Sequence, residues 1–215
     1  MKKFALGALL ILSTISAKSQ LSIGVKGGYS MSDISFYPSE DTRLLFGYGL
    51  DYGLVLKYYD LKYLGFQAEL YSINRGYRQA ADLAELGDTL YMRVNNYIEL
   101  PIFIQARLNL KLVYIHVNAG PYIAYMLNAK EGNNSSGDFK LKKIDFNVLR
   151  DKRLDYGIMA GVGLSRNFKW GTIQAEMRIA RGYGDFLDPD YPDNPKQSKA
   201  IVESVNVAYL YTFGK

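Results

Sequence analysis

Residues 46–58 read Phe-Gly-Tyr-Gly-Leu-Asp-Tyr-Gly-Leu-Val-Leu-Lys-Tyr, and this stretch decides the fold. Its even positions are all aliphatic or aromatic, whereas its odd positions include Gly47, Gly49, Asp51, Gly53 and Lys57. Successive side chains of a β-strand point to opposite faces. This period of two therefore predicts a strand with one apolar face and one face of small and charged residues.

The same alternation recurs along the rest of the chain and predicts eight strands in total. The other seven stretches are 21–30, 64–70, 90–108, 113–127, 154–164, 173–179 and 201–213. Their apolar faces are aliphatic in the middle and rich in Tyr and Phe toward the ends, which is typical of the lipid-facing surface of an outer-membrane barrel. Their second faces are Gly-rich with isolated charges, unlike the Lys-, Glu- and Thr-rich surface of a soluble sheet. The pattern predicts an all-β fold, an eight-stranded antiparallel up-and-down transmembrane β-barrel.

The lengths of the connections support a membrane barrel over a soluble β-sandwich. The predicted connections after the second, fourth and sixth strands are short, at 59–61, 109–111 and 167–171. Those after the first, third, fifth and seventh are long and polar, at 31–45, 74–89, 128–153 and 183–200. Short turns on one side and long loops on the other are typical of a transmembrane barrel with both termini in the periplasm.

The first 19 residues carry the pattern of a cleavable export signal. Lys2 and Lys3 precede the apolar run 4–12, and Ala17-Lys18-Ser19 follows polar small residues. We therefore expect a signal peptide at 1–19 and a single barrel domain at 20–215, located in the cell outer membrane. Most of the net charge of +5 belongs to the three lysines of this signal, so the pI of about 9.1 does not indicate a nucleic-acid ligand.

An alternative reading of residues 112–129 is a transmembrane helix, because this stretch carries no formal charge. Gly120-Pro121 interrupts its middle, and the alternation of Val113, Ile115 and Val117 with polar positions favours a strand. Pro101 and Pro121 each remove a ladder donor from a predicted strand, so we expect a β-bulge near each of them.

Four stretches of the chain resemble the PorT-like outer-membrane β-barrel family of Bacteroidota. They are Gly24-Val-Lys-Gly-Gly-Tyr-Ser30, Tyr97-Ile-Glu-Leu-Pro101, Gly120-Pro-Tyr122 and Gly157-Ile-Met-Ala-Gly-Val-Gly163. The resemblance spans the whole mature chain and implies an eight-stranded barrel. For the founding branch of that family it also implies a part in a type IX protein secretion apparatus.

Strand parity predicts which polar side chains face the lumen. The predicted lumen set is Lys26, Asp51, Lys57, Gln67, Glu69, Glu99, Gln105, Arg107, His116, Asp155, Gln174, Glu176 and Arg178. Its four cations Lys26, Lys57, Arg107 and Arg178 are available as counter-charges for the acids, because an unpaired buried charge is costly. We expect this polar network to seal and brace the barrel.

Folding the chain about its short turns also predicts cross-strand neighbours. About 167–171, equal parity places Gly161 near Glu176, Gly163 near Gln174, and Met159 near Arg178. About 59–61, it places Gly53 near Gln67, and either Asp51 or Gly49 near Glu69. Small residues opposite long ones are what an eight-stranded interior requires.

The sequence offers no residues for a catalytic, cofactor or metal site. The chain has no cysteine, and its one histidine, His116, falls on the lumen parity near a short turn, away from outer-leaflet lipid. The acidic loop 186–195 offers Asp oxygens for Ca²⁺ but lacks EF-hand spacing, so a solvated turn is favoured.

We therefore expect a non-catalytic, monomeric barrel that acts structurally or binds through its long loops. Its expected partners are outer-membrane lipid and, through the loops, secretion or envelope proteins, with no nucleic acid. Two alternatives stay open, a component of the secretion apparatus and a lipid-modifying enzyme.

Overall fold

The computed structural model describes residues 20–37, 44–59, 61, 63–80, 89–133, 141–144, 150–192 and 194–213, and the expected signal peptide lies outside these residues. Nine strands are present in this part of the chain. They are β1 (Gln20–Tyr37), β2 (Leu44–Tyr59), β3 (Leu64–Ala80), β4 (Thr89–Asn109), β5 (Tyr114–Asn133), β6 (Lys142–Ile144), β7 (Leu154–Phe168), β8 (Gly171–Gly182) and β9 (Gln197–Thr212).

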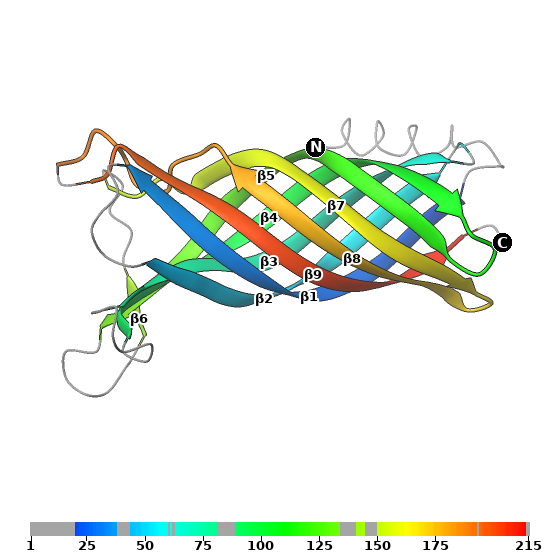
Figure 1. The fold of residues 1–215 in the computed structure, drawn as a ribbon, viewed down its shortest axis with the longest axis horizontal. Helices are drawn as coiled ribbons and strands as arrows, with labels where there is room; N and C mark the ends of the chain where they lie inside the picture. Colours follow the sequence, from blue (N-terminus) through cyan, green and yellow to red (C-terminus); the bar gives the residue numbers. More distant parts are fainter. Residues whose placement is uncertain are drawn as a thin grey trace, which may run out of the picture.

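Eight of these strands close into a ring, as the alternation predicts. Their order is β4-β3-β2-β1-β9-β8-β7-β5, and the β4–β5 pairing completes the circle, while the short β6 pairs only with β5 (Figure 1). All pairings in the ring are antiparallel.

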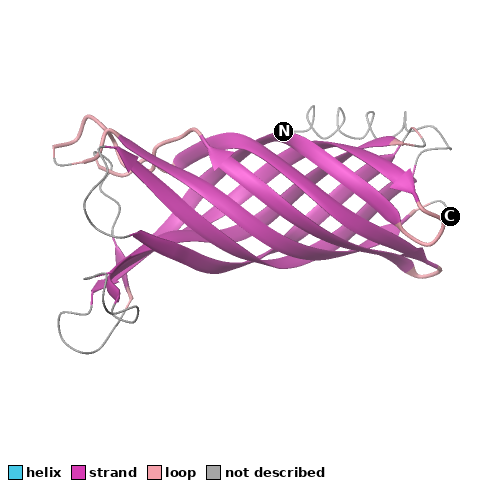
Figure 2. Cartoon of the chain, in the orientation of Figure 1, coloured by secondary structure: helices cyan, strands magenta, loops and turns pink. Residues whose placement is uncertain are grey.

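The strands of the ring are staggered. A path of paired residues that starts at Leu21 returns to the same strand ten residues further on, at Met31; it runs through Tyr58, Phe66, Ile104, Ala119, Ala160, Ile179 and Glu203. Such a stagger requires the strands to tilt, typically by about 35–45° from the barrel axis, and the tilt is visible in Figure 2.

The outer surface of the ring is apolar and is bounded by two aromatic girdles. On the side of the short turns, the exposed or half-buried rings are Phe66, Phe168, Trp170, Tyr209 and Tyr211, which we call the turn-side girdle. On the side of the long loops they are Tyr48, Tyr125, Tyr156 and Tyr183, the loop-side girdle. Trp170 stacks on Phe168 and Tyr209 with centroid distances of 4.9 and 5.7 Å. Paired girdles of this kind are the signature of a wall in contact with lipid.

Residues 112–129 lie mainly in β5, in agreement with the strand interpretation. In the described residues, we find no helix with the length and apolar character needed to span a membrane.

Several strands are longer than the sequence pattern predicts. β1 continues to Tyr37, β3 continues to Ala80, and β9 already begins at Gln197, so the predicted loops 31–45, 74–89 and 183–200 are shorter than expected. The ladder of backbone hydrogen bonds continues beyond the lipid-facing wall, where the outward residues become polar. The alternation of apolar and polar residues ends there, although the strand itself continues.

The backbone pairs are shifted from the predicted register by two residues in the β7–β8 hairpin and by four in the β2–β3 hairpin. Gly161 nevertheless lies beside Glu176 as predicted, since a Cβ at Gly161 would be 2.9 Å from Glu176 Oε1. Gly161 pairs with Arg178, Gly163 with Glu176, and Met159 with Ala180, because β7 and β8 extend to a tight turn at Lys169-Trp170. In the β2–β3 hairpin, the observed pairs are Gly53 with Tyr71, Val55 with Glu69, Lys57 with Gln67, and Asp51 with Ile73. The turn there follows Tyr59 and ends before Leu64, so its centre lies later in the chain than the pattern predicts.

The expected bulges at the two prolines are also absent. Pro101 pairs with Tyr122 and Pro121 with Ile158, and the irregularity between β4 and β5 lies at Asn96 and Tyr97. The β4–β5 pairing is interrupted between Pro101 and Ile104 and resumes in the same register. The chain therefore loses ladder contacts locally instead of inserting an extra residue.

Candidate functional site

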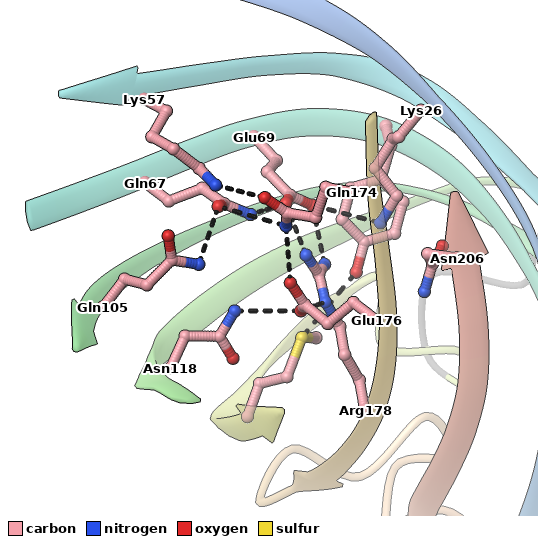
Figure 3. A network of polar contacts seen from close by, with 12 residues as sticks. Lys26, Lys57, Gln67, Glu69, Gln105, Asn118, Gln174, Glu176, Arg178 and Asn206 are labelled. Atoms are coloured by element: carbon pink, nitrogen blue, oxygen red, sulfur yellow. Dashed lines mark hydrogen bonds and ion pairs between the residues drawn. The ribbon is translucent and has the colours of Figure 1, made fainter. Parts of the chain in front are cut away.

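The middle of the lumen is occupied by an ion network that joins β1, β3 and β8 (Figure 3). The Arg178 guanidinium donates two hydrogen bonds to the Glu69 carboxylate, at 2.7 Å from Nη1 and 2.5 Å from Nη2. Lys26 Nζ lies 3.0 Å from the same carboxylate, and Arg178 Nε also pairs with Glu176. Because these side chains are at most 6% exposed, the network closes the lumen with paired charges.

Amides and the single histidine extend this network across the barrel. Asn118 Nδ2 donates to Glu176 at 2.9 Å, and His116 Nε2 lies 3.2 Å from the other oxygen of Glu176. Gln174 Nε2 also donates to Glu176 at 2.7 Å, and its own Oε1 accepts a hydrogen bond from Lys57. His116 is 1% exposed and engaged by a carboxylate, so it occupies a structural position in the lumen.

A second network lies on the loop side of the first and is centred on Arg75 of β3. Arg75 pairs with Glu99 of β4 and, at 2.5 Å, with Asp155 of β7. Tyr71 donates to Glu99, and Tyr122 donates to Asp155 at 3.0 Å. One guanidinium thus neutralises two carboxylates from different strands.

Above this layer, an Arg93–Asp151 pair lies under an aromatic cap. Arg93 Nη2 lies 3.0 Å from Asp151, and its guanidinium lies 5.4 Å from the ring centroid of Phe186. Phe186 packs edge-on against Phe36 at 6.0 Å and is 5% exposed. The connection between β8 and β9 therefore folds inward and covers the loop-side mouth of the lumen.

The two longest connections are hydrogen-bonded to each other on top of this cap. Asp151 and Leu187 form an isolated β-bridge, and the Lys152 amide donates to the Phe186 carbonyl at 3.0 Å. Asp188 accepts a hydrogen bond from the backbone N–H of Asp190 at 3.1 Å, which holds the pKa of its carboxyl below the ordinary value, with a further contribution from Lys152. We call the segments 150–153 and 185–198 the outer platform.

The turn-side end of the lumen is closed by aromatic and apolar contacts. The Arg107 guanidinium lies 3.6 Å from the ring centroid of Tyr59, and Tyr59 in turn donates to Gln105. Val55, Ala208 and Leu210 form a small buried apolar cluster nearby in the wall.

The structure places all thirteen residues of the predicted lumen set on the inner face, where only Arg107 is half-buried and the others are buried. It does not join them all as expected. Lys57 bonds to an amide instead of a carboxylate, and the buried Asp51 carboxylate has no hydrogen-bond donor among the described residues.

Sequence reasoning missed Arg75, Arg93 and Asp151, which complete the two outer layers. Arg75 falls in a segment predicted to be a loop. It shares the odd parity of Gln67 and Glu69, so continuing the alternation past the apolar residues would have identified it.

Little space remains around the central network. A cavity of about 10 Å³ borders Lys26, Glu69 and Arg178, which is close to the smallest volume that holds one water molecule. Within the described ranges, no three His, Asp or Glu side chains gather in a way that could hold a metal ion.

Comparison with known proteins agrees with this architecture. A family model described as an outer membrane protein beta-barrel domain matches residues 14–188. The fold is similar to that of the outer membrane protein OprG from Pseudomonas aeruginosa, with a TM-score of 0.51 and 12% identity over 92% of this chain and 96% of that one. Ail, the attachment invasion locus protein of Yersinia pestis, matches with a TM-score of 0.44 and 16% identity over 89% of this chain and 99% of that one.

A search of curated proteins finds no significant match to the sequence. The family model covers most of the chain, and the closed ring of strands is a β-barrel, as the description of the family states. The chain therefore belongs to the family of outer membrane protein β-barrel domains and is an outer-membrane β-barrel protein.

Proposed function

We propose that this protein is a non-catalytic, non-conducting barrel that anchors the outer platform at the cell surface for binding. The observation that carries the proposal is the layered ion network, in which Arg178 and Arg75 each hold two carboxylates across the lumen. An eight-stranded barrel is just wide enough for its own side chains, so these bridges leave no room for a solute path.

The bridges also resist displacement. Breaking a buried ion pair leaves an uncompensated charge, at a cost of about 3–5 kcal/mol. Opening the lumen would break several such pairs together, because Glu69, Glu176 and Arg178 share one network. The network therefore suits a rigid support better than a gate.

Bilayer recording tests the closed lumen. Folded protein reconstituted in planar bilayers is expected to show no steady conductance, and a shift in gel mobility between boiled and unboiled samples would establish that it is folded. A porin reconstituted in parallel controls for insertion. Large and reproducible single-channel steps would contradict the proposal.

The platform is suited to binding because its two segments are ordered against each other before any partner arrives. A preorganised surface loses less conformational entropy on binding than two independent loops would. With both termini in the periplasm, this surface faces the outside of the cell.

Site-specific photo-crosslinking in intact cells tests the platform. A photo-reactive residue at the exposed Asp190 is expected to give adducts with envelope or external partners, whereas one at Lys111, in a short turn, serves as a control on the opposite rim. The same adducts from both positions, or none from Asp190, would contradict binding at the platform.

The structure gives the competing functions less support. His116, the base that a lipid-modifying enzyme would need, is enclosed in the lumen and bonded to Glu176. Tyr97, Glu99 and Pro101, which carry the resemblance to the PorT-like family, are buried, and Glu99 pairs with Arg75 inside the lumen. These motif residues therefore support bracing of the barrel rather than a place in a secretion apparatus.

A further inference from the structure

The lipid-facing wall carries two charges where the rest of it is apolar. Between the two girdles, the outward-facing residues that the structure describes are uncharged apart from Arg181 of β8 and Glu203 of β9, both of which are exposed. Arg166, on β7, lies within the turn-side girdle and stacks on Phe168. Charged residues on a lipid-facing wall are destabilising unless they lie near the interface or find a partner.

Neither charge finds such a partner within the barrel. In the described part of the chain, no side-chain hydrogen bond or ion pair involves Arg181 or Glu203. They occupy adjacent strands, with Arg181 opposite Ile201 and Glu203 opposite Ile179.

The two charges flank a hollow in the wall. A recess of about 620 Å³ is bordered by Glu203, and a second recess of about 430 Å³ is bordered by Arg181. The two recesses meet at Ala160 and Ile179, which line both of them. Ala119 and Ala160, whose short side chains point outward, keep their floor low, so another wall can approach this side of the barrel closely.

The register places Arg181 and Glu203 side by side at nearly the same depth in the membrane. Glu203 lies one strand over from Arg181 and two residues nearer the turn side. Neighbouring strands are spaced ~4.8 Å apart and tilt by about 35–45° from the barrel axis. Crossing from β8 to β9 moves toward the loop side, and moving two residues back along β9 returns toward the turn side by a similar amount, so the depths are nearly equal. Both displacements point the same way around the wall and together separate the two residues by ~8 Å.

We infer that a second copy of this chain packs against this face, with Glu203 of each copy paired with Arg181 of the other. A closed, symmetric dimer of copies inserted in the same direction has its two-fold axis along the membrane normal, which preserves depth. Such an interface is isologous, so an acid and a base at equal depth on one patch become two reciprocal ion pairs. This dimer differs from the monomer expected from the sequence.

A second copy fits this face better than lipid does. Arg181 and Glu203 lie just inside the loop-side girdle, since Arg181 is two residues from Tyr183 and Glu203 pairs with Met31, the partner of Tyr48. Acyl chains alone would leave both charges without partners there. An anionic phosphate headgroup would pair with Arg181 but would be repelled by Glu203 beside it. A second copy satisfies both charges, and the short side chains of Ala119 and Ala160 let the two walls approach closely.

Disulfide trapping tests the position of the axis. Ile179 lies between the two charges, and the chain has no cysteine of its own. Ile179→Cys in outer membranes is therefore expected to form a disulfide-linked dimer on mild oxidation. Leu70→Cys is the matched control, because Leu70 is similarly exposed on β3, four strands away from β8 in either direction around the ring.

Charge reversal then tests the pairing in the Ile179→Cys background. Arg181→Glu alone and Glu203→Arg alone should each lower the cross-linked fraction, because like charges face each other, and the double reversal should restore it. Heat-modifiable gel mobility would show that each variant folds. Equal cross-linking of Ile179→Cys and Leu70→Cys would overturn the proposal. A double reversal that fails to restore the cross-linked fraction would overturn it too. If Arg181→Glu lowered the cross-linked fraction and Glu203→Arg did not, the result would instead indicate a phosphate-bearing lipid at this face.

Discussion

Arg75 is the side chain on which the loop-side half of the lumen depends. It pairs with Glu99 and Asp155, and its guanidinium lies 5.1 Å from the ring centroids of Tyr97 and Tyr122. Glu99, in contrast, is one of the two carboxylates that pair with Arg75, so Arg75 keeps a partner when Glu99 is lost. The two ends of this ion pair are therefore not equivalent.

Replacing Arg75 should consequently destabilise the barrel more than replacing Glu99. Arg75→Met leaves two buried carboxylates without a cation, with an expected loss of about 3–5 kcal/mol in the free energy of unfolding. Glu99→Leu leaves Arg75 paired with Asp155 and removes the acceptor of Tyr71, with a loss of about 1–3 kcal/mol. Denaturant unfolding in lipid vesicles would measure both.

Lys142→Met is a suitable control for the Arg75 comparison. Lys142 is exposed on β6, outside the ring, so the loss of its charge should change stability by no more than about 0.5 kcal/mol. If Arg75→Met proved no more destabilising than Glu99→Leu, Arg75 would not be the centre of its network.

At the scale of the strands, glycine decides where two backbones can approach. A Cβ at Gly120 of β5 would lie 1.9 Å from the Ile102 carbonyl oxygen of β4, at the point where the prolines interrupt the ladder. A Cβ at Gly27 of β1 would meet nothing closer than 3.9 Å. Of these two glycines, only Gly120 is required by a close contact.

The same substitution at these two glycines should have opposite consequences. Gly120→Ala is expected to reduce the fraction of folded, heat-modifiable protein, because the β4–β5 pairing that closes the ring must separate. Gly27→Ala should be neutral or stabilising by about 0.4–1 kcal/mol, since alanine restricts the unfolded chain. Gel mobility shifts after refolding into detergent would compare them. Equal folding yields would show that β4 and β5 can relax around the added methyl group.

At the scale of the whole molecule, the antiparallel up-and-down order of the strands places the described short turns on one rim and the described long connections on the other. The β4–β5 and β7–β8 turns lie at the end where Ser22 of β1 meets Thr212 of β9, whereas β6 and the outer platform lie at the opposite end (Figure 1). The two rims therefore face different compartments.

Labelling of single cysteines should report this sidedness. In intact cells, an impermeant maleimide is expected to label Lys142→Cys and to leave Lys111→Cys unlabelled until the outer membrane is opened, because short turns of a transmembrane barrel typically lie on the periplasmic side. Both lysines are exposed, so accessibility in detergent provides the control. Labelling of Lys111→Cys in intact cells would invert the topology.

The sequence by itself determined the fold class, the sorting of short and long connections, and the face that each side chain takes. These follow from the period of two, which is a local property of a strand and needs no knowledge of its neighbours. The alternation predicted inward positions for Glu69 and Arg178 alike, although they are separated by 109 residues in the chain.

Only the tertiary structure decided which of the inward residues meet. Glu69 bonds to Arg178 and Lys26, and Glu99 bonds to Arg75, because the turns at 60–63 and 169–170 set the hairpin registers and the ten-residue stagger sets the height of every strand around the ring. A one-residue change in the position of a turn centre moves each cross-strand partner by two residues and leaves parity unchanged. The pattern of faces is therefore insensitive to register, whereas the ion pairs depend on it entirely.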